Sequence, residues 1–218
     1  MEELNYHVDF GPFYVHLTQK QKRYLAVRSV IDRVLAALAL VLLSPLFLMV
    51  SIAQKISAPD EPIFFQQKRV GKGAHCFNII KFRTMKSSAP KNVATGDLEN
   101  PQMYISKVGR FLRDTSIDEL PQLFNILIGD MSLVGPRPER PQYVEKFKEE
   151  IPRYMIKHQV RPGLTGWAQI NGLRGDTDIA ERIRYDIWYI ENWTVALDIK
   201  ILFRTVFGGK MVNDEKIQ

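Results

Sequence analysis

The sequence predicts an α+β fold that is mainly helical, and three observations lead to this prediction. An uncharged apolar segment, residues 34–53, contains a Ser-Pro pair near its middle. Two runs of alternating residues flank a Gly-Lys-Gly turn at 71–73, as in a β-hairpin. Apolar residues then recur at helical spacing toward the C-terminus. We therefore expect a membrane helix, a small β-hairpin and a set of packed helices.

The length of the chain indicates how many domains it can form, and its charge indicates the kind of partner it can bind. The chain has 218 residues, enough for one domain with a sizeable core and some appendages. Its formal net charge is +6, and 45% of its residues are hydrophobic. Such a chain suits an acidic partner: nucleic acid, anionic lipid or a phosphorylated substrate. The single cysteine, Cys76, excludes an internal disulfide and a cluster of thiolate metal ligands.

The apolar segment 34–53 is long enough to cross a bilayer as a helix of about 30 Å. It starts too far from the N-terminus to be a cleavable signal peptide. Basic residues on both flanks conflict with a single crossing, because such residues prefer the cytoplasmic side. They are Lys20, Lys22, Arg23, Arg28 and Arg33 before the segment, and Lys55, Lys68, Arg69 and Lys72 after it.

Ser44 and Pro45 lie near the middle of this segment. Pro45 removes one backbone donor and clashes with the preceding turn, so we expect a bend there, with Ser44 available to bond a freed carbonyl. A helix that enters the membrane, bends at this pair and returns to the same face satisfies both the bend and the charges. The residues alone leave a straight but kinked span equally open.

Residues 58–62, Ala-Pro-Asp-Glu-Pro, are expected to end the membrane helix, because prolines interrupt helices. The soluble part is expected to begin there. Strands are expected at 63–70 and 75–82, on either side of a turn whose spacing is not that of a P-loop. On the residues alone, Lys81 is an ordinary solvated charge. Residues 86–102 lack apolar periodicity and predict a mobile loop over the site. A helix follows, indicated by the spacing of Ile105, Val108, Phe111 and Leu112.

A second helix is predicted within the segment 115–141. Ser116 and Glu119 have the spacing of a capping box, and Pro121 is tolerated in a first helical turn. We expect this helix to begin between Ser116 and Glu119 and to end at Gly129. Its predicted buried stripe consists of Leu120, Leu123, Phe124 and Leu127.

Asp118 and Glu119 would then lie at a helix N-terminus, where free amides and the helix dipole favour anions. Two adjacent carboxylates can hold Mg²⁺, and an ionised aspartate can attack phosphorus to form an acyl phosphate. Arg137 lies between two prolines, which would fix its guanidinium against a phosphate. A capped helix start would explain the acidic pair alone. Together with Arg113 and the Gly-Pro-Arg-Pro turn, the pair favours phosphate chemistry.

Aromatic residues recur at helical spacing near the C-terminus. They are Tyr185, Trp188, Tyr189 and Trp193. Residues 194–210 mix apolar and basic side chains, as in an amphipathic helix that lies in the membrane plane. Packing in an ordinary core against the preceding helices is an equal alternative.

Three segments together resemble a known family. They read "KFRTM" at 81–85, "SIDELPQLFNILIGDMSLVGPRPERP" at 116–141 and "RPGLTGWAQINGLRGDTD" at 161–178. These are similar to segments of the monotopic phosphoglycosyl transferases, also called bacterial sugar transferases. The resemblance implies a mainly helical α+β fold with a re-entrant membrane helix hairpin bent at Ser44 and Pro45. The small β-hairpin, catalytic helices and in-plane amphipathic helices complete that fold.

The activity that the resemblance implies is transfer of a sugar-1-phosphate from a UDP-sugar to undecaprenyl phosphate, with release of UMP and a requirement for Mg²⁺. The resemblance favours a hexose as the sugar of the donor over an N-acetylated sugar. The reaction would begin exopolysaccharide, capsule or O-antigen type glycan synthesis. The resemblance also implies a monotopic protein that is bound to membrane lipid on the cytoplasmic face of the bacterial inner membrane.

The resemblance also assigns roles to residues. Asp118 would be the nucleophile that carries the sugar phosphate, and Glu119 would bind Mg²⁺, with Asp118 as a further ligand. The basic positions that would contact phosphate are Lys81, Arg113, Arg137 and Arg161. The third segment would form the nucleotide-sugar wall, with Asp176, Asp178 or Asp186 contributing to the site.

The expected organisation is an N-terminal extension at 1–26, a re-entrant helix at 27–57, a catalytic domain at 58–210 and a tail at 211–218. Many members of the family carry further membrane helices and another domain, so we expect either a minimal enzyme or a catalytic fragment. A membrane-anchored phosphohydrolase and a non-catalytic lipid-binding scaffold are the alternatives. Binding to nucleic acid would account for the positive charge but would not explain the apolar segment 34–53, so no nucleic-acid partner is expected. The sugar, the pathway and homodimer formation stay open.

Overall fold

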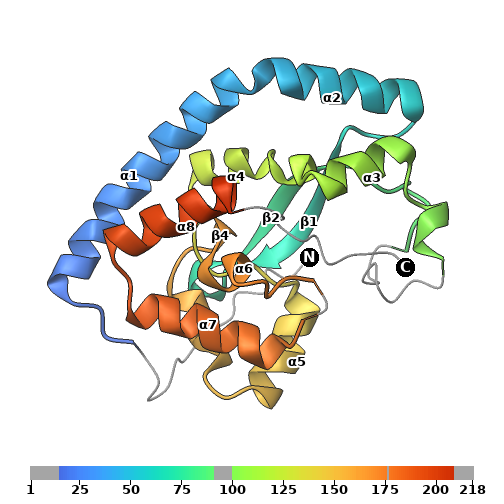
Figure 1. Cartoon of the computed structure of the whole chain (residues 1–218). Coiled ribbons are helices and arrows are strands. Elements are labelled where there is room, and N and C mark those ends of the chain that lie inside the picture. Colours follow the sequence, from blue (N-terminus) through green and yellow to red (C-terminus); the bar gives the residue numbers. More distant parts are fainter. Residues whose placement is uncertain (1–14, 91–99, 176, 209–218) are drawn as a thin grey trace.

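The computed structural model describes residues 15–90, 100–175 and 177–208, and Figure 1 shows the arrangement of their elements. The α-helices are α1 (Gln19–Leu42), α2 (Ser44–Ser57), α3 (Lys107–Asp114), α4 (Gln122–Ile128), α5 (Pro141–Glu150), α6 (Trp167–Ile170), α7 (Ile179–Glu191) and α8 (Val195–Phe207). The strands are β1 (Phe64–Val70), β2 (Cys76–Phe82), β3 (Ser132–Val134) and β4 (Gly163–Thr165). The 3₁₀ turns are η2 (Lys72–Ala74), η4 (Pro101–Met103), η5 (Ile117–Glu119) and η6 (Tyr154–Gln159). The mainly helical class is therefore confirmed.

Some of the sequence predictions fall outside these residues. They concern residues 1–14 of the N-terminal extension, the central part of the predicted loop at 91–99, Asp176, and residues 209–218, which include the tail at 211–218.

The bend predicted at Ser44 and Pro45 is confirmed. Helices α1 and α2 meet at an angle of 59° and arch over one side of the molecule (Figure 1). Pro45 stands in the first turn of α2, where its missing N–H is tolerated. The Ser44 hydroxyl donates to the Val41 carbonyl at 2.8 Å, close to the helix break. The serine therefore satisfies a carbonyl at the point where the proline interrupts the helical ladder.

Helix α1 is longer than the predicted membrane segment. It runs without a break from Gln19 through the expected boundary between residues 26 and 27. In the described part of the chain, no single helix has the length and apolar character needed to cross a membrane. The bent α1–α2 pair meets both criteria when its two halves are taken together.

The predicted β-hairpin is confirmed. Strands β1 and β2 pair antiparallel in a register that sets Phe64 opposite Phe82 and Val70 opposite Cys76. Gly73 in the connecting turn has φ +65°, a left-handed conformation that glycine adopts without steric cost. The hairpin places Lys81 next to the last residue of β2, so its position in space follows from the local sequence.

A second, parallel sheet was not predicted. Strands β3 and β4 have three residues each, and Ser132 lies opposite Gly163 in their register. The two backbones approach so closely that a Cβ on Gly163 would lie 2.0 Å from the Gly135 nitrogen. Glycines at these positions therefore allow the Gly-Pro-Arg-Pro turn to pack directly against the strand that follows Pro162.

The start of α4 differs from the prediction. Ser116 has φ +57° and its side chain makes no capping bond, so the expected capping box does not form. The chain instead makes the 3₁₀ turn η5, and the α-helix begins only after Pro121. The predicted end at Gly129 is confirmed, with φ +98°. The acidic pair thus lies in a 3₁₀ turn before the helix.

The buried face of α4 also differs from the predicted stripe. Leu123 is buried, but Phe124 and Leu127 are exposed, and Asn125 is fully buried. The Asn125 side chain accepts a hydrogen bond from the Ile80 amide at 2.9 Å and donates to the Asn78 carbonyl at 2.8 Å. These bonds satisfy backbone groups of β2 and turn α4 so that its asparagine faces the hairpin.

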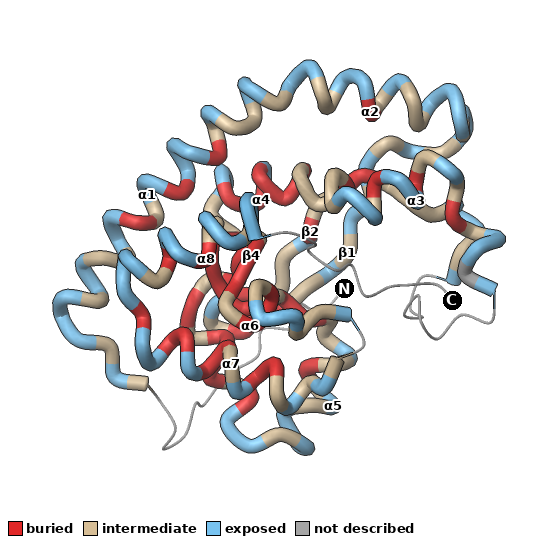
Figure 2. The backbone as a smooth tube through the Cα atoms, viewed as in Figure 1, coloured by how far each residue is buried: buried red, intermediate tan, exposed pale blue. Residues whose placement is uncertain are grey.

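Most of the core lies among α5, α7, α8, η6 and strand β3, whereas much of α1 and α2 is exposed (Figure 2). The C-terminal aromatic residues divide between the two predicted environments. Tyr189 and Trp193 are buried in this core. Trp188 is exposed and stacks on Trp167 with ring centroids 5.0 Å apart. An exposed apolar face remains on α8, formed by Val195, Ile199, Phe203, Val206 and Phe207.

Arg28 joins the first helix to this core. Its side chain is buried, donates from NH1 to the Tyr189 hydroxyl at 3.1 Å, and lies 3.3 Å from Asp198 Oδ2. It also donates to the Val134 carbonyl of β3. One guanidinium thus contacts β3, α7 and α8, so the N-terminal half of α1 belongs to the packed body.

Candidate active site

Asp118 and Glu119 occupy η5, between α3 and α4. Ser116 has a left-handed conformation between α3 and η5, and η5 packs against β2, so the acidic pair lies next to this strand. Asp118 is 8% exposed, and the side chain of Glu119 is 19% exposed. Buried carboxylates need cations or hydrogen-bond donors nearby, and the structure supplies cations from three other segments.

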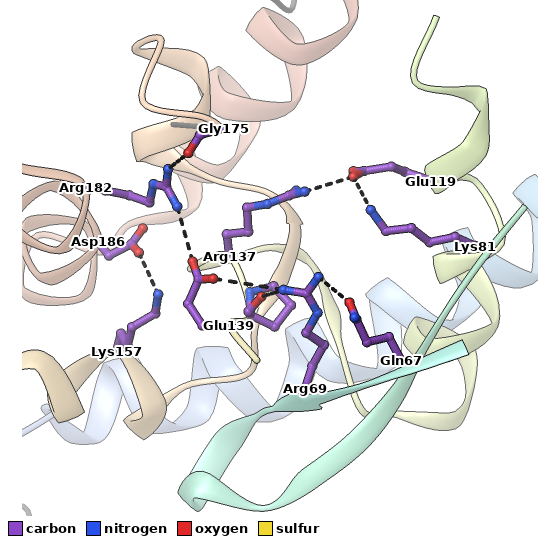
Figure 3. Close-up of polar contacts among 11 residues, drawn as sticks. Gln67, Arg69, Lys81, Glu119, Arg137, Glu139, Lys157, Gly175, Arg182 and Asp186 are labelled. Carbon is purple, nitrogen blue, oxygen red and sulfur yellow. Dashed lines mark hydrogen bonds and ion pairs between the residues drawn. The ribbon is translucent and has the colours of Figure 1, made fainter. Parts of the chain in front are cut away.

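Glu119 is the point at which two of these segments meet. Its Oε1 atom accepts from Lys81 Nζ at 2.7 Å and from Arg137 NH2 at 3.1 Å (Figure 3). Burial alone would raise the pKa of Glu119, but Arg137 and Lys81 outweigh it and hold that pKa well below its usual range. Glu119 is therefore ionised throughout the physiological range.

Asp118 has the opposite behaviour. Burial raises the pKa of Asp118 to about 6, against the pull of Lys81 and with a further rise from the charge of Glu119. Arg113 and Arg137 also favour its charged form. Near neutral pH the carboxylate is thus largely ionised but poorly solvated. This is the state in which an aspartate is an effective nucleophile.

The remaining predicted cations divide into two groups. Arg113, in the last turn of α3, donates from Nε to Thr84 Oγ1 at 2.9 Å and faces the Asp118 side. Arg161 instead donates to Ser29 Oγ on α1 at 2.6 Å, and its electrostatic neighbours are led by Arg33. Lys81, Arg113 and Arg137 are therefore brought together with the acidic pair, whereas Arg161 is placed against the first helix.

The Gly-Pro-Arg-Pro turn is fixed by backbone hydrogen bonds. The Gly135 amide donates to the Thr165 carbonyl at 2.8 Å, and the Gly163 amide donates to the Pro136 carbonyl at 3.0 Å. Arg69 NH1 donates to the Pro138 carbonyl at 3.1 Å. The turn is anchored on both sides of Arg137, which agrees with the rigidity expected from its two prolines.

The predicted acidic residues of the third segment have structural partners. Asp178 caps α7 by accepting from the Ala180 amide at 2.8 Å. Asp186 is buried, and its Oδ2 lies 3.5 Å from Lys157 Nζ. Burial raises the pKa of Asp186 to about 6, against the pull of Lys157. The hydrogen-bond partners given for Glu119 are Lys81 and Arg137, so these two aspartates bond elsewhere in the described residues.

A second layer of charges behind Arg137 was missed at the level of sequence. Glu139 lies between Arg182, at 3.3 Å, and Arg69, at 4.0 Å. Burial would raise the pKa of Glu139, but Lys157, Arg69 and Arg182 outweigh it and lower that pKa. Two signals could have found this layer. Glu139 directly follows the Gly-Pro-Arg-Pro turn, and Arg182 stands on the apolar face of α7.

The donor chemistry of the acidic pair fits Mg²⁺. In the described ranges there is no group of three or more His, Cys, Asp or Glu side chains that could hold a metal. Mg²⁺, however, is commonly held by one or two carboxylates and completes its shell with water and substrate phosphates. Both cation contacts of Glu119 use the same oxygen, Oε1. Its other oxygen and the Asp118 carboxylate are suitable hard donors.

Comparison with known proteins places this geometry in context. The family model described as bacterial sugar transferase matches residues 23–210. The chain is similar to a UDP-glucose:undecaprenyl-phosphate glucose-1-phosphate transferase of Escherichia coli (strain K12), with 47% identity over 182 residues. These residues are 82% of this chain and 39% of that protein.

Two further relatives differ in length and name. A UDP-N-acetylgalactosamine-undecaprenyl-phosphate N-acetylgalactosaminephosphotransferase of Aeromonas hydrophila is 42% identical over 84% of this chain and 43% of its own length. An uncharacterized sugar transferase of Bacillus subtilis (strain 168) is 40% identical over 84% of this chain and 86% of its own length. The chain therefore spans about two fifths of the two longer relatives.

The two adjacent carboxylates should have opposite effects on stability. At pH 7.5, Asp118→Asn removes a charge that burial disfavours, and should raise the free energy of unfolding by up to about 3 kcal/mol. Glu119→Gln removes the partner of two cations and should lower it by about 3 kcal/mol. Thermal unfolding of both variants in detergent measures the difference.

The pH dependence provides the control. The folded-state pKa of Asp118 is raised, so its stabilising contribution is full below the unfolded value of 3.8 and is lost as pH rises through about 6. The advantage of Asp118→Asn should therefore shrink as pH falls from 7 to 4. An Asp118→Asn protein less stable than wild type at pH 7.5 would contradict this account.

Proposed function

Because this chain belongs to the bacterial sugar transferase family, we propose that it transfers a sugar-1-phosphate from a UDP-sugar to undecaprenyl phosphate and releases UMP. The observation that carries the proposal is the buried Asp118 carboxylate beside Glu119, surrounded by Lys81, Arg113 and Arg137. The printed names of the relatives support the reaction class. Those names contain different sugars, glucose and N-acetylgalactosamine, so the donor sugar stays open, with a hexose as the first choice.

In the first step, an oxygen of the Asp118 carboxylate attacks the phosphorus that carries the sugar. The bond between this phosphorus and the bridging oxygen of the diphosphate breaks, and UMP leaves with the electron pair. The sugar phosphate is then bound covalently to Asp118. Lys81, Arg113 and Arg137 stabilise the negative charge on the transferring phosphoryl group.

In the second step, a phosphate oxygen of undecaprenyl phosphate attacks the same phosphorus. The bond to Asp118 breaks, the carboxylate is restored, and the lipid-linked diphosphate sugar is formed. Glu119 stays ionised through both steps, because Lys81 and Arg137 hold its pKa low. It therefore keeps two of the phosphate-binding cations in place while the charge on Asp118 changes.

A magnesium ion would be held by Asp118 and Glu119 together with the diphosphate of the donor. When bound, it would neutralise charge on that diphosphate. Glu119 is suited to this task because it remains negative at every pH at which Asp118 can act.

Undecaprenyl phosphate is a membrane lipid, and the bent helix pair would hold the active site at the membrane surface where this acceptor lies. Apolar side chains are exposed along α1 and α2, among them Leu38, Leu42, Leu48 and Ile56. We propose that the pair enters the cytoplasmic leaflet of the bacterial inner membrane and returns to the same face, so the protein is monotopic. The basic residues near the two outer ends of the pair, among them Lys20, Lys22, Arg23 and Lys55, then stay on the cytoplasmic side.

UMP release by the detergent-solubilised protein tests the reaction. With Mg²⁺, undecaprenyl phosphate and a panel of UDP-sugars, wild type should release UMP with at least one sugar. Asp118→Asn should lower the rate at least about 10³-fold, because an amide is no nucleophile. Asp114→Asn, an exposed aspartate at the end of α3, is the matched control and should be unaffected. Equal rates in wild type and Asp118→Asn would sink the proposal, whereas free sugar phosphate as the final product would indicate a phosphohydrolase.

Membrane topology tests the bend. Replacing Ser44-Pro45 by Leu-Leu restores the backbone donor and should straighten the helix, sending the N-terminus across the membrane. An N-terminal tag should then become accessible from outside the cell membrane. Ser51→Leu changes a serine of α2 away from the bend and is the control. A tag that stays cytoplasmic in the Leu-Leu variant would contradict the re-entrant arrangement.

A further inference from the structure

Arg182 of α7 is a buried cation with partners in two separate segments. It is 4% exposed, and its NH1 atom lies 3.3 Å from Glu139 Oε1. Its NH2 atom donates to the Gly175 carbonyl at 2.6 Å and to Thr177 Oγ1 at 3.1 Å. Glu139 follows the Gly-Pro-Arg-Pro turn, whereas Gly175 and Thr177 belong to the loop before α7. One guanidinium therefore joins the turn to the loop (Figure 3).

Glu139 transmits this connection to the turn. Its Oε2 atom lies 4.0 Å from Arg69 NH1, and Arg69 also donates to the Pro138 carbonyl. The Val70 amide donates to the Glu139 carbonyl at 2.9 Å. The turn is thus held between β1 on one side and Arg182 on the other. If Arg182 moves, Glu139 loses one of its two ion-pair partners and keeps Arg69. Glu139 is two residues from Arg137, so the position of Arg137 would change with it.

The arrangement in space follows the same order. Figure 3 shows the side chain of Arg137 extended between the Arg182–Glu139 pair and Glu119. Arg137 reaches Glu119 at 3.1 Å. The loop before α7 is exposed at Gly172, which has φ +86°, and at Gly175. The hydrogen bond from Arg182 to the Gly175 carbonyl attaches this loop to the packed body. Its position is therefore linked to the position of Arg137 through two buried side chains.

We propose that Arg182 is a positioning residue that acts through Glu139 and couples the loop residues Gly175 and Thr177 to the placement of Arg137. The inference rests on the proposed function and extends it. Contacts that the donor makes with this loop, away from the reacting phosphorus, would set how Arg137 is held when charge develops on the phosphoryl group. Arg182 itself touches no substrate in this scheme.

Steady-state kinetics of UMP release, with UDP-glucose and the other UDP-sugars that wild type accepts, measure the effect. Arg182→Gln should lower kcat by about 10- to 100-fold and change KM for the UDP-sugar by less than about threefold, because it misplaces a group that acts in the transition state. Arg184→Gln is the matched control on the same helix. Arg184 is exposed and pairs with Glu181, so its replacement should change neither constant.

A double-mutant cycle with Arg137→Ala separates positioning from a general loss of structure. If Arg182 acts through Arg137, Arg182→Gln should cost less than about threefold in the Arg137→Ala background. Independent, multiplicative losses would overturn the inference. Wild type that releases no UMP with any sugar would overturn the proposed function instead, so the two failures are distinguishable.

A second variant keeps the test valid if Arg182→Gln does not fold. Thr177→Val is nearly isosteric and removes only the loop acceptor at 3.1 Å. It should lower kcat in the same direction by a smaller factor, about threefold to tenfold, and should have no effect in the Arg137→Ala background. Wild-type kcat in Thr177→Val, or an equal loss in both backgrounds, would contradict the proposed coupling. Thermal unfolding shows which variants are folded.

Discussion

The ion pairs of Glu119 with Lys81 and Arg137 are the interaction on which the site depends. They connect residues that are 38 and 18 positions away in sequence, at the end of the hairpin and in the Gly-Pro-Arg-Pro turn. The same cations lower the cost of burying Asp118 next to another negative charge. Removing Glu119 would take away the shared partner of Lys81 and Arg137 and would change the electrostatic field at Asp118.

Two buried guanidinium groups tie the rest of the molecule to this site. Arg28 attaches the first helix to α7 and α8, so the N-terminal half of this helix and the packed body form one structure. Arg182 attaches the loop before α7 to the turn that carries Arg137. The first helix and the loop before α7 are therefore each attached to the packed body through buried polar contacts, whose strength depends on being fully paired.

Much of the site was predictable from sequence because its signals are local. A proline within an apolar helix fixes the bend, and a Gly-Lys-Gly turn fixes the hairpin that carries Lys81. The face of α4 was not predictable, because Asn125 satisfies backbone groups of β2, and that pairing leaves no periodic pattern. The link from Arg182 to Glu139 was missed for the same reason: the two residues are 43 positions apart and each appears alone in its segment.

The covalent intermediate on Asp118 tests the central claim most directly. Purified protein would be incubated with the UDP-sugar it accepts and Mg²⁺, without undecaprenyl phosphate, and its intact mass measured by mass spectrometry. The account predicts a mass increase of one sugar phosphate, mapped to Asp118 in peptides, absent from Asp118→Asn and lost when undecaprenyl phosphate is added. An adduct on another residue would contradict the account. So would the absence of an adduct on Asp118 in a preparation that forms the lipid product once undecaprenyl phosphate is added.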